Sequence, residues 1–211
     1  MTITRHLDDA TLMSFAAGSL PGALAAVAAA HVAMCGRCRG EVAFLERIGG
    51  ALLGSLPQVA MLRPKPALPE FGGPQEATAS PGEVPSGEVP PPLMRIAGAS
   101  LDSVRWRWIA PGLWHRPLPI RGEGSLHLLK GSPGVSVPEH GHGGSELTLV
   151  LRGALLDSSG RYGPGDVADF DEGIEHSPAA DATGCICVVA NERPTRFRNL
   201  LAQLLRPWHG I

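Results

Sequence analysis

The first quarter of the chain carries apolar residues at the spacing of short helices. Within residues 7–56 the apolar positions recur three or four residues apart, which is the period of an amphipathic helix. Asp8 and Asp9 stand where helix N-terminal caps belong, and Pro21 precedes the second apolar stripe. We therefore predict two or three short helices within residues 1–56. Their apolar stripes are Leu12, Phe15, Ala16 and Leu20; Leu24, Val27, Ala28 and Val32; and Val42, Leu45, Ile48 and Leu52.

The helical pattern ends at a proline-rich stretch. Ten of the 20 prolines fall within residues 57–92. A proline inside a helix costs about 3 kcal/mol, so this stretch disfavours a helix. Residues 81–92, PGEVPSGEVPPP, have the low complexity typical of a flexible or polyproline-like linker. We interpret residues 57–92 as a linker between two folded parts.

Beyond residue 93 the apolar pattern changes to one typical of strands. Many short strands with no helices between them predict an antiparallel sandwich or barrel over residues 93–211. Residues 195–206 have the apolar spacing of a terminal amphipathic helix. The predicted strands, separated by Gly, Pro or Asp turns, are residues 104–108, 126–130, 146–151, 167–170 and 185–189. The aromatics interpreted as core or domain-packing residues are Trp106, Trp108 and Trp114.

Composition and charge limit the classes of protein to consider. The chain has 211 residues, 27 glycines and a formal net charge of −2 at pH 7, which disfavours non-specific binding to nucleic acid. Residues 1–10 lack the apolar core of a signal peptide, and the most apolar run, residues 22–34, is too short to span a membrane. We therefore expect a cytoplasmic protein that binds neither DNA nor a membrane. In that compartment its cysteines serve as metal ligands, redox thiols or buried small residues.

The predicted helical part contains a group of metal-ligand residues. The run HVAMCGRC places His31, Cys35 and Cys38 at positions i, i+4 and i+7. In an unbroken helix the first and last would lie roughly 10.5 Å apart along the axis, too far to share one ion, so a break is required. Gly36 can supply the break, and His6 is the only other histidine in this half of the chain. These ligands predict a Cys2His2 zinc site that staples a small helical unit. A CxxC redox pair or two buried thiols are the alternatives.

A second group of metal-ligand residues lies in the predicted β part. His140 and His142 are two residues apart, so both side chains project to one face of an extended strand. Glu146 follows a two-glycine bend, and His176 on a distant strand can complete the set. Three imidazoles and one carboxylate suit a divalent cation with one or two open positions. We predict zinc there first, with manganese, iron or nickel as alternatives; scattered surface histidines are the competing interpretation.

Two other features lie close to this second group in the sequence. Cys185 and Cys187 are two residues apart and hence on one face of a strand, where thiols near a metal can report oxidants. They can equally be small core residues. Glu175 precedes His176 and is either an outer partner of the metal ligands or part of a solvated acidic turn.

The motifs of both parts resemble those of known families. His31, Cys35 and Cys38 reproduce the H-x3-C-x2-C signature of zinc-binding anti-sigma domains, which also carry an upstream histidine. Residues 134–153 match the first cupin motif, G-x5-H-x-H-x3-E-x6-G, at every fixed position. The second cupin motif keeps two glycines and His176 but not its proline and asparagine. This combination closely resembles the ChrR-type anti-sigma factors.

The resemblance to ChrR-type anti-sigma factors implies a regulatory function and no enzymatic one. In that family a zinc domain holds a sigma factor of the extracytoplasmic-function type, and a cupin domain responds to singlet oxygen or related reactive oxygen species. The resemblance implies a two-domain α + β fold: a zinc-stapled helical domain at residues 1–56, the linker at 57–92 and a cupin barrel at 93–211. Family domains usually continue into a further helix where this chain begins its proline-rich stretch. The alternative is a metal cupin enzyme, of dioxygenase or isomerase type, fused to a zinc-binding module.

Overall fold

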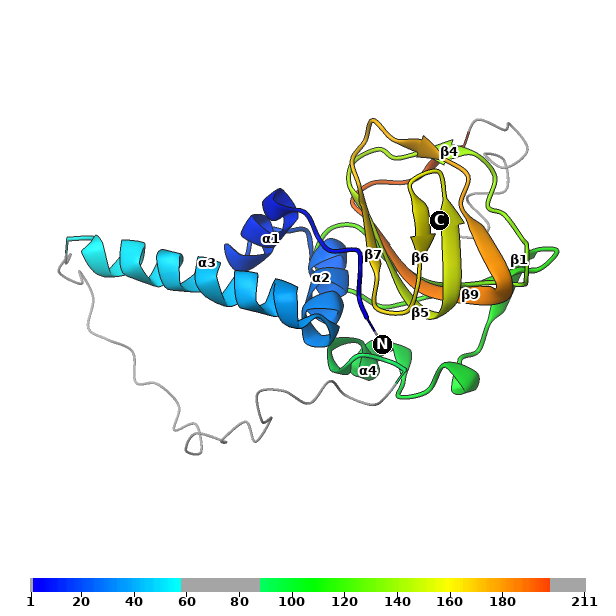
Figure 1. Ribbon diagram of the computed structural model, residues 1–211, viewed down its shortest axis with the longest axis horizontal. Coiled ribbons are helices and arrows are strands. Elements are labelled where there is room, and N and C mark those ends of the chain that lie inside the picture. Colours follow the sequence, from blue (N-terminus) through cyan, green and yellow to red (C-terminus); the bar gives the residue numbers. More distant parts are fainter. Residues whose placement is uncertain (1, 58–87, 198–211) are drawn as a thin grey trace.

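The computed structural model describes residues 2–57 and 88–197 (Figure 1). Three helices near the N-terminus precede a short fourth helix and an antiparallel β-structure, which confirms the predicted fold class. None of the helices in the described ranges is long and apolar enough to cross a membrane. The helices are α1 (Asp9–Ala16), α2 (Gly22–Met34), α3 (Gly36–Ser55) and α4 (Pro91–Ala97), with a 3-10 turn at Leu101–Ser103.

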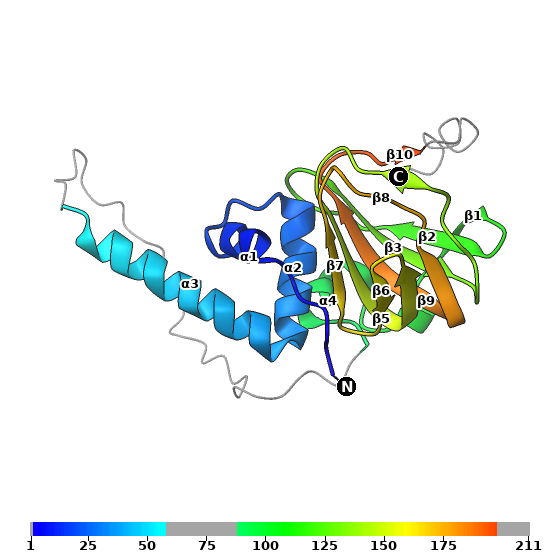
Figure 2. The ribbon, with the colours of Figure 1, turned by 45° about the horizontal axis from the view of Figure 1, so that its top comes forward.

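The β part consists of two antiparallel sheets within the described residues. The larger sheet has seven strands in the order β1-β2-β3-β9-β5-β6, with β7 pairing with β5. The smaller sheet has the order β10-β4-β8 and lies at one end of the larger one (Figure 2). The strands are β1 (Arg107–Ala110), β2 (Leu113–Pro117), β3 (Ser125–Gly131), β4 (His140–Gly141), β5 (Glu146–Asp157), β6 (Gly160–Tyr162), β7 (Val167–Phe170), β8 (Glu175–His176), β9 (Ala179–Asn191) and β10 (Arg196–Phe197).

Helix α2 connects the helical part to the β part. Its sequence, GALAAVAAAHVAM, is apolar on all sides, and a helix with that pattern needs to be buried. Leu24 and Val27 of α2 belong to the same buried cluster as Leu128 of β3 and Val188 of β9. Figure 2 shows α2 between the other N-terminal helices and the large sheet. The two halves therefore share one hydrophobic core.

Two glycines permit the close approach of α2 to the β part. A Cβ atom at Gly124 would lie 2.9 Å from the Cβ of Ala23, and one at Gly22 would overlap the carbonyl oxygen of Arg121. The backbone N–H of Ala23 donates to the carbonyl oxygen of Glu123 over 3.1 Å. These contacts fix the N-terminus of α2 against the loop that precedes β3.

The tryptophans of the β part differ in their surroundings. Trp106 and Trp114 are partly buried and flank the ammonium group of Lys130 at 5.8 and 5.6 Å from their ring centres. Trp108 is 60% exposed because it lies on β1, an edge strand of the large sheet. The interpretation of Trp108 as a core or packing aromatic is therefore wrong. The strand predicted at residues 104–108 also begins later than expected, at Arg107.

The structure changes the interpretation of two predicted segments. Helix α4 starts inside the predicted linker, since prolines are tolerated in the first turn of a helix, and it packs on α2 with Leu93 buried. Residues 58–87 of the linker lie outside the described residues. The terminal helix predicted at residues 195–206 is wrong at its start, where residues 196–197 pair with β4, and the remainder lies outside the described residues. The domain boundaries at residues 56 and 92 stay a prediction.

Candidate metal centres

The N-terminal cluster consists of His6, His31, Cys35 and Cys38. One ligand atom from each of these residues lies within 4.8 Å of the others. Nε2 of His31 is 3.2 Å from Sγ of Cys38, and Nδ1 of His6 is 3.4 Å from Sγ of Cys35 and 3.7 Å from Sγ of Cys38. Tetrahedral zinc separates a ligand nitrogen from a ligand sulfur by about 3.6 Å. The four side chains therefore fit an ion of that size.

A break between α2 and α3 produces the N-terminal cluster. Cys35 has an extended backbone with φ −104° and ψ 109°, and it ends α2 and caps α3. Its Sγ accepts the backbone N–H of Cys38 over 3.5 Å. His31 in the last turn of α2 thereby faces Cys38 in the first turn of α3. The required break is present, but it lies at Cys35, whereas Gly36 is already the first residue of α3.

Burial sets the protonation of the N-terminal cluster. Burial lowers the pKa of His31 to about 4, against a smaller opposing effect of its hydrogen bond to Gly165. Nδ1–H of His31 donates to the carbonyl oxygen of Gly165 over 2.9 Å, which leaves the Nε2 lone pair directed at the thiols. Burial, with the charge and hydrogen bond of Cys35, raises the pKa of Cys38 to about 11. A metal would therefore bind a neutral imidazole and displace a thiol proton.

The cupin cluster consists of His140, His142, Glu146 and His176, all of which are buried. One ligand atom from each lies within 4.8 Å of the others. His140 and His176 are paired across β4 and β8, and their Nε2 atoms are 3.0 Å apart. Two nitrogens bound to one ion at about 2.1 Å lie roughly 3.0 to 3.4 Å apart for bond angles between 90° and 109°. The geometry fits a divalent transition metal.

Outer partners orient the histidines of the cupin cluster. Nδ1 of His176 lies 2.7 Å from the Asp157 carboxylate, and Nδ1 of His140 lies 2.8 Å from the carbonyl oxygen of Pro138. Both contacts direct Nε2 into the cluster, which is the usual arrangement of metal-ligating histidines. Nε2 of His142 is buried with no hydrogen-bond partner in the part of the chain that the structure describes. A bound cation would satisfy that atom.

The carboxylate of Glu146 is ionised in this surrounding. Burial alone would raise the pKa of Glu146, but the hydrogen bond and charge of His142 outweigh it, with additions from His140 and His176. The pKa of Glu146 is therefore below its ordinary value. Burial lowers the pKa of His140. The cluster accordingly presents an anionic carboxylate together with a neutral His140 imidazole, the forms in which both groups bind metals.

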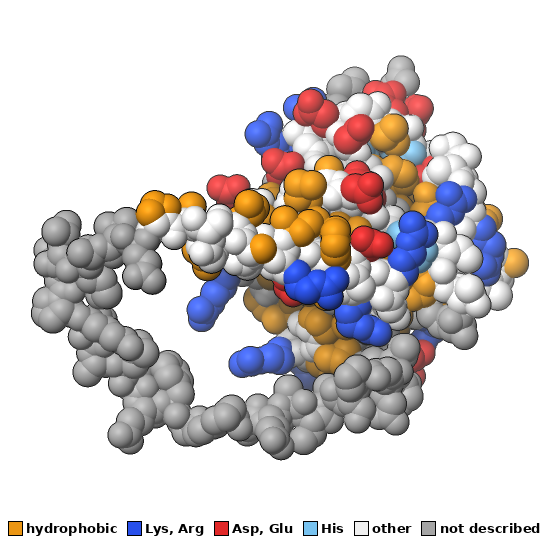
Figure 3. Space-filling view, turned by 60° about the vertical axis from the view of Figure 1, so that its left-hand side comes forward, with side chains coloured by type: hydrophobic (Ala, Val, Ile, Leu, Met, Phe, Trp, Pro, Cys, Tyr) orange, Lys and Arg blue, Asp and Glu red, His pale blue; other side chains and the backbone are white. Residues whose placement is uncertain are grey.

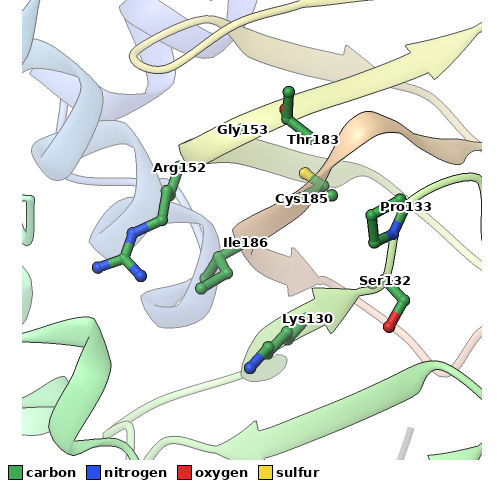
Figure 4. Close-up of a pocket in the computed structure, with 10 residues that line it drawn as sticks. Lys130, Ser132, Pro133, Arg152, Gly153, Thr183, Cys185 and Ile186 are labelled. Atoms are coloured by element: carbon green, nitrogen blue, oxygen red, sulfur yellow. The ribbon is translucent and has the colours of Figure 1, made fainter.

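Cys185 and Cys187 lie on the interior side of β9 and are buried. Cys185 also lines a cavity of about 230 Å³, together with Lys130, Arg152 and Thr183 (Figure 4). The hydrogen bond with Cys185, burial and the charge of Cys185 raise the pKa of Cys187 well above its ordinary value. A thiol reacts with oxidants mainly as the thiolate, so Cys187 is poorly reactive in this state.

Comparisons with known proteins place the whole chain in one family. Residues 96–194 match the family described as the ChrR cupin-like domain. The chain is 37% identical over 214 residues to the anti-sigma-E factor ChrR of Cereibacter sphaeroides, covering 100% of both chains. The chain belongs to the ChrR family of anti-sigma factors. The crystal structure of Rhodobacter sphaeroides SigE in complex with the anti-sigma ChrR matches with a TM-score of 0.76 and 37% identity, covering 90% of this chain and 100% of that one.

The sequence left two functions open, an anti-sigma factor and a metal cupin enzyme. Membership in the ChrR family favours the anti-sigma factor. The full-length relationship to an anti-sigma factor confirms the expected regulatory, non-enzymatic class. The cupin fold alone does not make that distinction, because one fold hosts many functions.

Three partners of the ligands were not indicated by the sequence: the carboxylate of Asp157 and the carbonyl oxygens of Pro138 and Gly165. Metal-ligating histidines generally donate their second ring N–H to a carboxylate or a carbonyl oxygen, so the sequence could predict that such partners exist. It could not predict which residues supply them. Glu175, the candidate adjacent to His176, is exposed, and strand alternation places it on the other face of β8. The solvated-turn interpretation of Glu175 agrees with that exposure.

Proposed function

We propose that this chain is a cytoplasmic anti-sigma factor that sequesters a sigma factor of the extracytoplasmic-function type and releases it in response to singlet oxygen or related reactive oxygen species. The relationship to ChrR over the full chain supports the partner, because the solved ChrR complex contains SigE. The cupin cluster supports the sensing step, because it places oxidisable imidazoles around a potential metal site.

The observation that carries the proposal is an apolar row on α3. Phe44, Ile48 and Leu52 recur every four residues along α3, and Leu56 caps its C-terminal end; their side chains are 51%, 43%, 64% and 62% exposed, respectively. Hydrophobic side chains gather along α3 where it projects from the molecule (Figure 3). A row of exposed apolar residues at helical spacing is typical of a helix that binds a groove in a partner. We assign this row to the sigma factor.

The N-terminal metal centre lies at the base of α3, the helix that carries the apolar row assigned to the sigma factor. Cys38 and Val42, in the first two turns of α3, are buried, whereas the apolar row lies further along the helix. We propose that His6, His31, Cys35 and Cys38 bind zinc, whose preference for tetrahedral nitrogen and sulfur ligands suits this set. Zinc bound there would hold the base of α3 against α1 and α2.

The cupin cluster is the proposed sensor. We propose that His140, His142, Glu146 and His176 hold a divalent cation, zinc first and manganese, iron or nickel as alternatives. Oxidation of a ligand would remove a donor from the ion and disturb the strands that supply it. Cys185 and Cys187 are proposed as an additional redox pair, and the raised pKa of Cys187 favours the metal cluster as the primary site.

Sigma-factor binding is tested by co-expressing the chain with a sigma factor encoded beside its gene. We expect the wild type to co-purify with it, and the double variant Ile48→Asp/Leu52→Asp to lose the complex, because two charges would be buried in an apolar contact. Leu156→Asp is the matched control, since Leu156 is an apolar residue of β5 that is 41% exposed. A wild type that forms no complex would refute the partner assignment.

Oxidant sensing is tested on the purified complex with singlet oxygen generated by an illuminated dye. We expect the wild type to release the sigma factor. Glu146→Gln should bind the sigma factor and release far less of it, because a neutral amide is a weaker ligand for a divalent transition metal than a carboxylate. Equal release from the wild type and Glu146→Gln would remove the cupin cluster from the sensing step.

A further inference from the structure

We infer that the cupin positions the two histidine ligands of the N-terminal metal centre through the turn at residues 163–166, which precedes β7. The groups that hydrogen-bond to a ligand or to the backbone beside it are called the outer shell of the centre. The inference deepens the proposed function and rests on it in one respect, since it assumes that a metal binds the N-terminal cluster. It assigns positioning functions to Gly165 and Asp166, which belong to the other half of the chain.

Asp166 holds the segment on one side of His6. Its Oδ1 accepts the backbone N–H groups of Thr4 over 2.6 Å and Arg5 over 2.9 Å. Its Oδ2 accepts the backbone N–H of Gly163 over 2.8 Å, which fixes the carboxylate within its own turn. Asp166 is only 5% exposed. Charge-assisted hydrogen bonds in such a buried position are among the stronger ones in proteins.

Two further contacts bind the backbone around His6 to the cupin. On the same side as Asp166, the backbone N–H of Val167 donates to the carbonyl oxygen of Arg5 over 3.4 Å. On the other side of His6, the N–H of Asp8 donates to the Asp169 carboxylate over 3.1 Å. Figures 1 and 2 both show the N-terminal segment running past β7 before it enters α1. His6 therefore lies between two points at which its backbone is bound to the cupin.

Gly165 orients the second histidine of the same cluster. Its carbonyl oxygen accepts Nδ1–H of His31, and its backbone has φ +85°, a value that favours glycine. The two histidine ligands are thus oriented by adjacent cupin residues, while Cys35 and Cys38 are positioned by the α2–α3 break. The outer shell of the centre is divided between the two halves of the chain.

The opposite end of β7 contacts the cupin cluster. The ring of Phe170, the last residue of β7, lies 6.2 Å from the His142 ring and 4.6 Å from the His176 ring, measured between centroids. β7 has four residues, a length of roughly 13 Å at 3.3 Å per residue. One short strand therefore touches the ligands of one centre and carries at its other end the turn that orients the ligands of the other. A rearrangement around Phe170 would be transmitted to His6 and His31 through this strand.

The first test uses the full-length protein loaded with Co²⁺. A thiolate-to-cobalt absorption band reports only the N-terminal centre, because the cupin cluster contains no thiol among its ligands. We expect Asp166→Ala to lose that band at an about tenfold lower chelator concentration than the wild type, the lower end of the usual outer-shell effect on metal affinity. Asp166→Asn should be intermediate, because its amide oxygen still accepts from Thr4 and Arg5 while its NH₂ group cannot accept from Gly163. The matched control Asp181→Ala, which removes a carboxylate bound to Thr183 and Arg161, should match the wild type.

The second test requires neither a metal nor a sigma factor. Hydrogen exchange of the amides of residues 2–8 should accelerate in Phe170→Leu, whereas Val189→Ala, a truncation on β9 beside the same interior cluster, should leave it unchanged. Unchanged exchange in Phe170→Leu, or equal acceleration in Val189→Ala, would overturn transmission through β7. Equal cobalt loss from Asp166→Ala and the wild type would overturn the outer-shell assignment. A wild type without the thiolate band would instead refute the proposed N-terminal metal, and absence of a sigma-factor complex would affect only the proposed partner.

Discussion

The two candidate metal centres have the same number of ligands but are built differently. Three ligands of the N-terminal cluster fall within eight residues at one helix break, and the fourth comes from the segment before α1. The cupin cluster takes its ligands from β4, the following loop, β5 and β8, and it forms only when those strands pair. The first cluster can therefore organise a small helical unit around an ion, whereas the second depends on a sheet that is already folded.

The donor sets of the two centres suggest different uses. Two thiolates and two imidazoles would neutralise a divalent ion and close a tetrahedron, which is typical of structural zinc. Three imidazoles and one carboxylate would leave a net positive charge and open positions, which suits an ion that meets small molecules. The proposed contrast is between a centre that would hold α3 and one that would respond to its surroundings.

The largest effect is expected from removing a ligand of the N-terminal centre. Cys38→Ser should release the metal, whose binding contributes about 10 to 16 kcal/mol in small zinc-dependent units. Amide protection in α1 and α3 should be lost, while α2 keeps its protection because it is buried against the sheet. Hydrogen exchange measures both changes, and Cys185→Ser is the control. Retained protection of α3 in Cys38→Ser would contradict a structural function of this centre.

A smaller effect is expected from acid on the metal-free protein, in which α2 stays packed on the sheet and keeps His31 against Gly165. Burial lowers the pKa of His31 from 6.5 to about 4, so between those values the unfolded chain binds a proton that the folded chain does not. The free energy of unfolding should therefore fall as the pH decreases from 7 to 4, with His31 accounting for up to about 3 kcal/mol.

Urea unfolding at several pH values, compared between the wild type and His31→Gln, measures that contribution. The comparison isolates His31 because His140 and His127, whose pKa values are also lowered by burial, remain in both proteins. Identical pH dependence in the two proteins would exclude His31 as its source.

A still smaller effect is expected from changing Asp157, the carboxylate that orients His176 in the cupin centre. Asp157→Asn removes the charge that orients His176 and should weaken metal binding by the cupin about 10- to 100-fold. Competition with a chromophoric chelator measures the affinity. The thiolate band of the cobalt-loaded N-terminal centre should persist, and a loss of that band as well would show that the substitution disturbs the whole fold.

The smallest effect is expected at Glu175, the other carboxylate near His176. Its side chain is exposed and lies on the opposite face of β8. Glu175→Gln should leave the metal affinity of the cupin within about twofold of the wild type, because solvent screens exposed charges. The same competition assay checks it, and a loss as large as that of Asp157→Asn would reverse the assignment of the outer partner.

Much of the fold followed from local patterns in the sequence. The apolar stripes predicted helices that the structure shows as α1, α2 and α3, and the short runs after residue 93 predicted most of the long strands. Local pattern failed to predict secondary structure or burial at positions where contacts with residues distant in the sequence decide them. Residues 196–197 have helical spacing but pair with β4, and Trp108 is aromatic but lies on an edge strand.

The eight candidate ligands were accessible from the sequence because chemistry restricts them to a few residue types at restricted spacings. The groups that orient them were not. Asp157 carries no motif, and the carbonyl oxygens of Pro138 and Gly165 are backbone atoms that every residue possesses. Their function comes from position alone.

The sequence by itself indicated the two groups of candidate ligands, the α and β halves and the resemblance to a regulatory family, since spacing and side-chain chemistry are local properties. Only the tertiary structure decided that the halves share a core through α2 and that Asp166 and Gly165 reach across to His6 and His31. The physical reason is that a turn finds its hydrogen-bond partners by proximity in the folded chain. Residues more than 130 positions apart become neighbours there, as His31 and Gly165 do, with a separation of 134 in sequence.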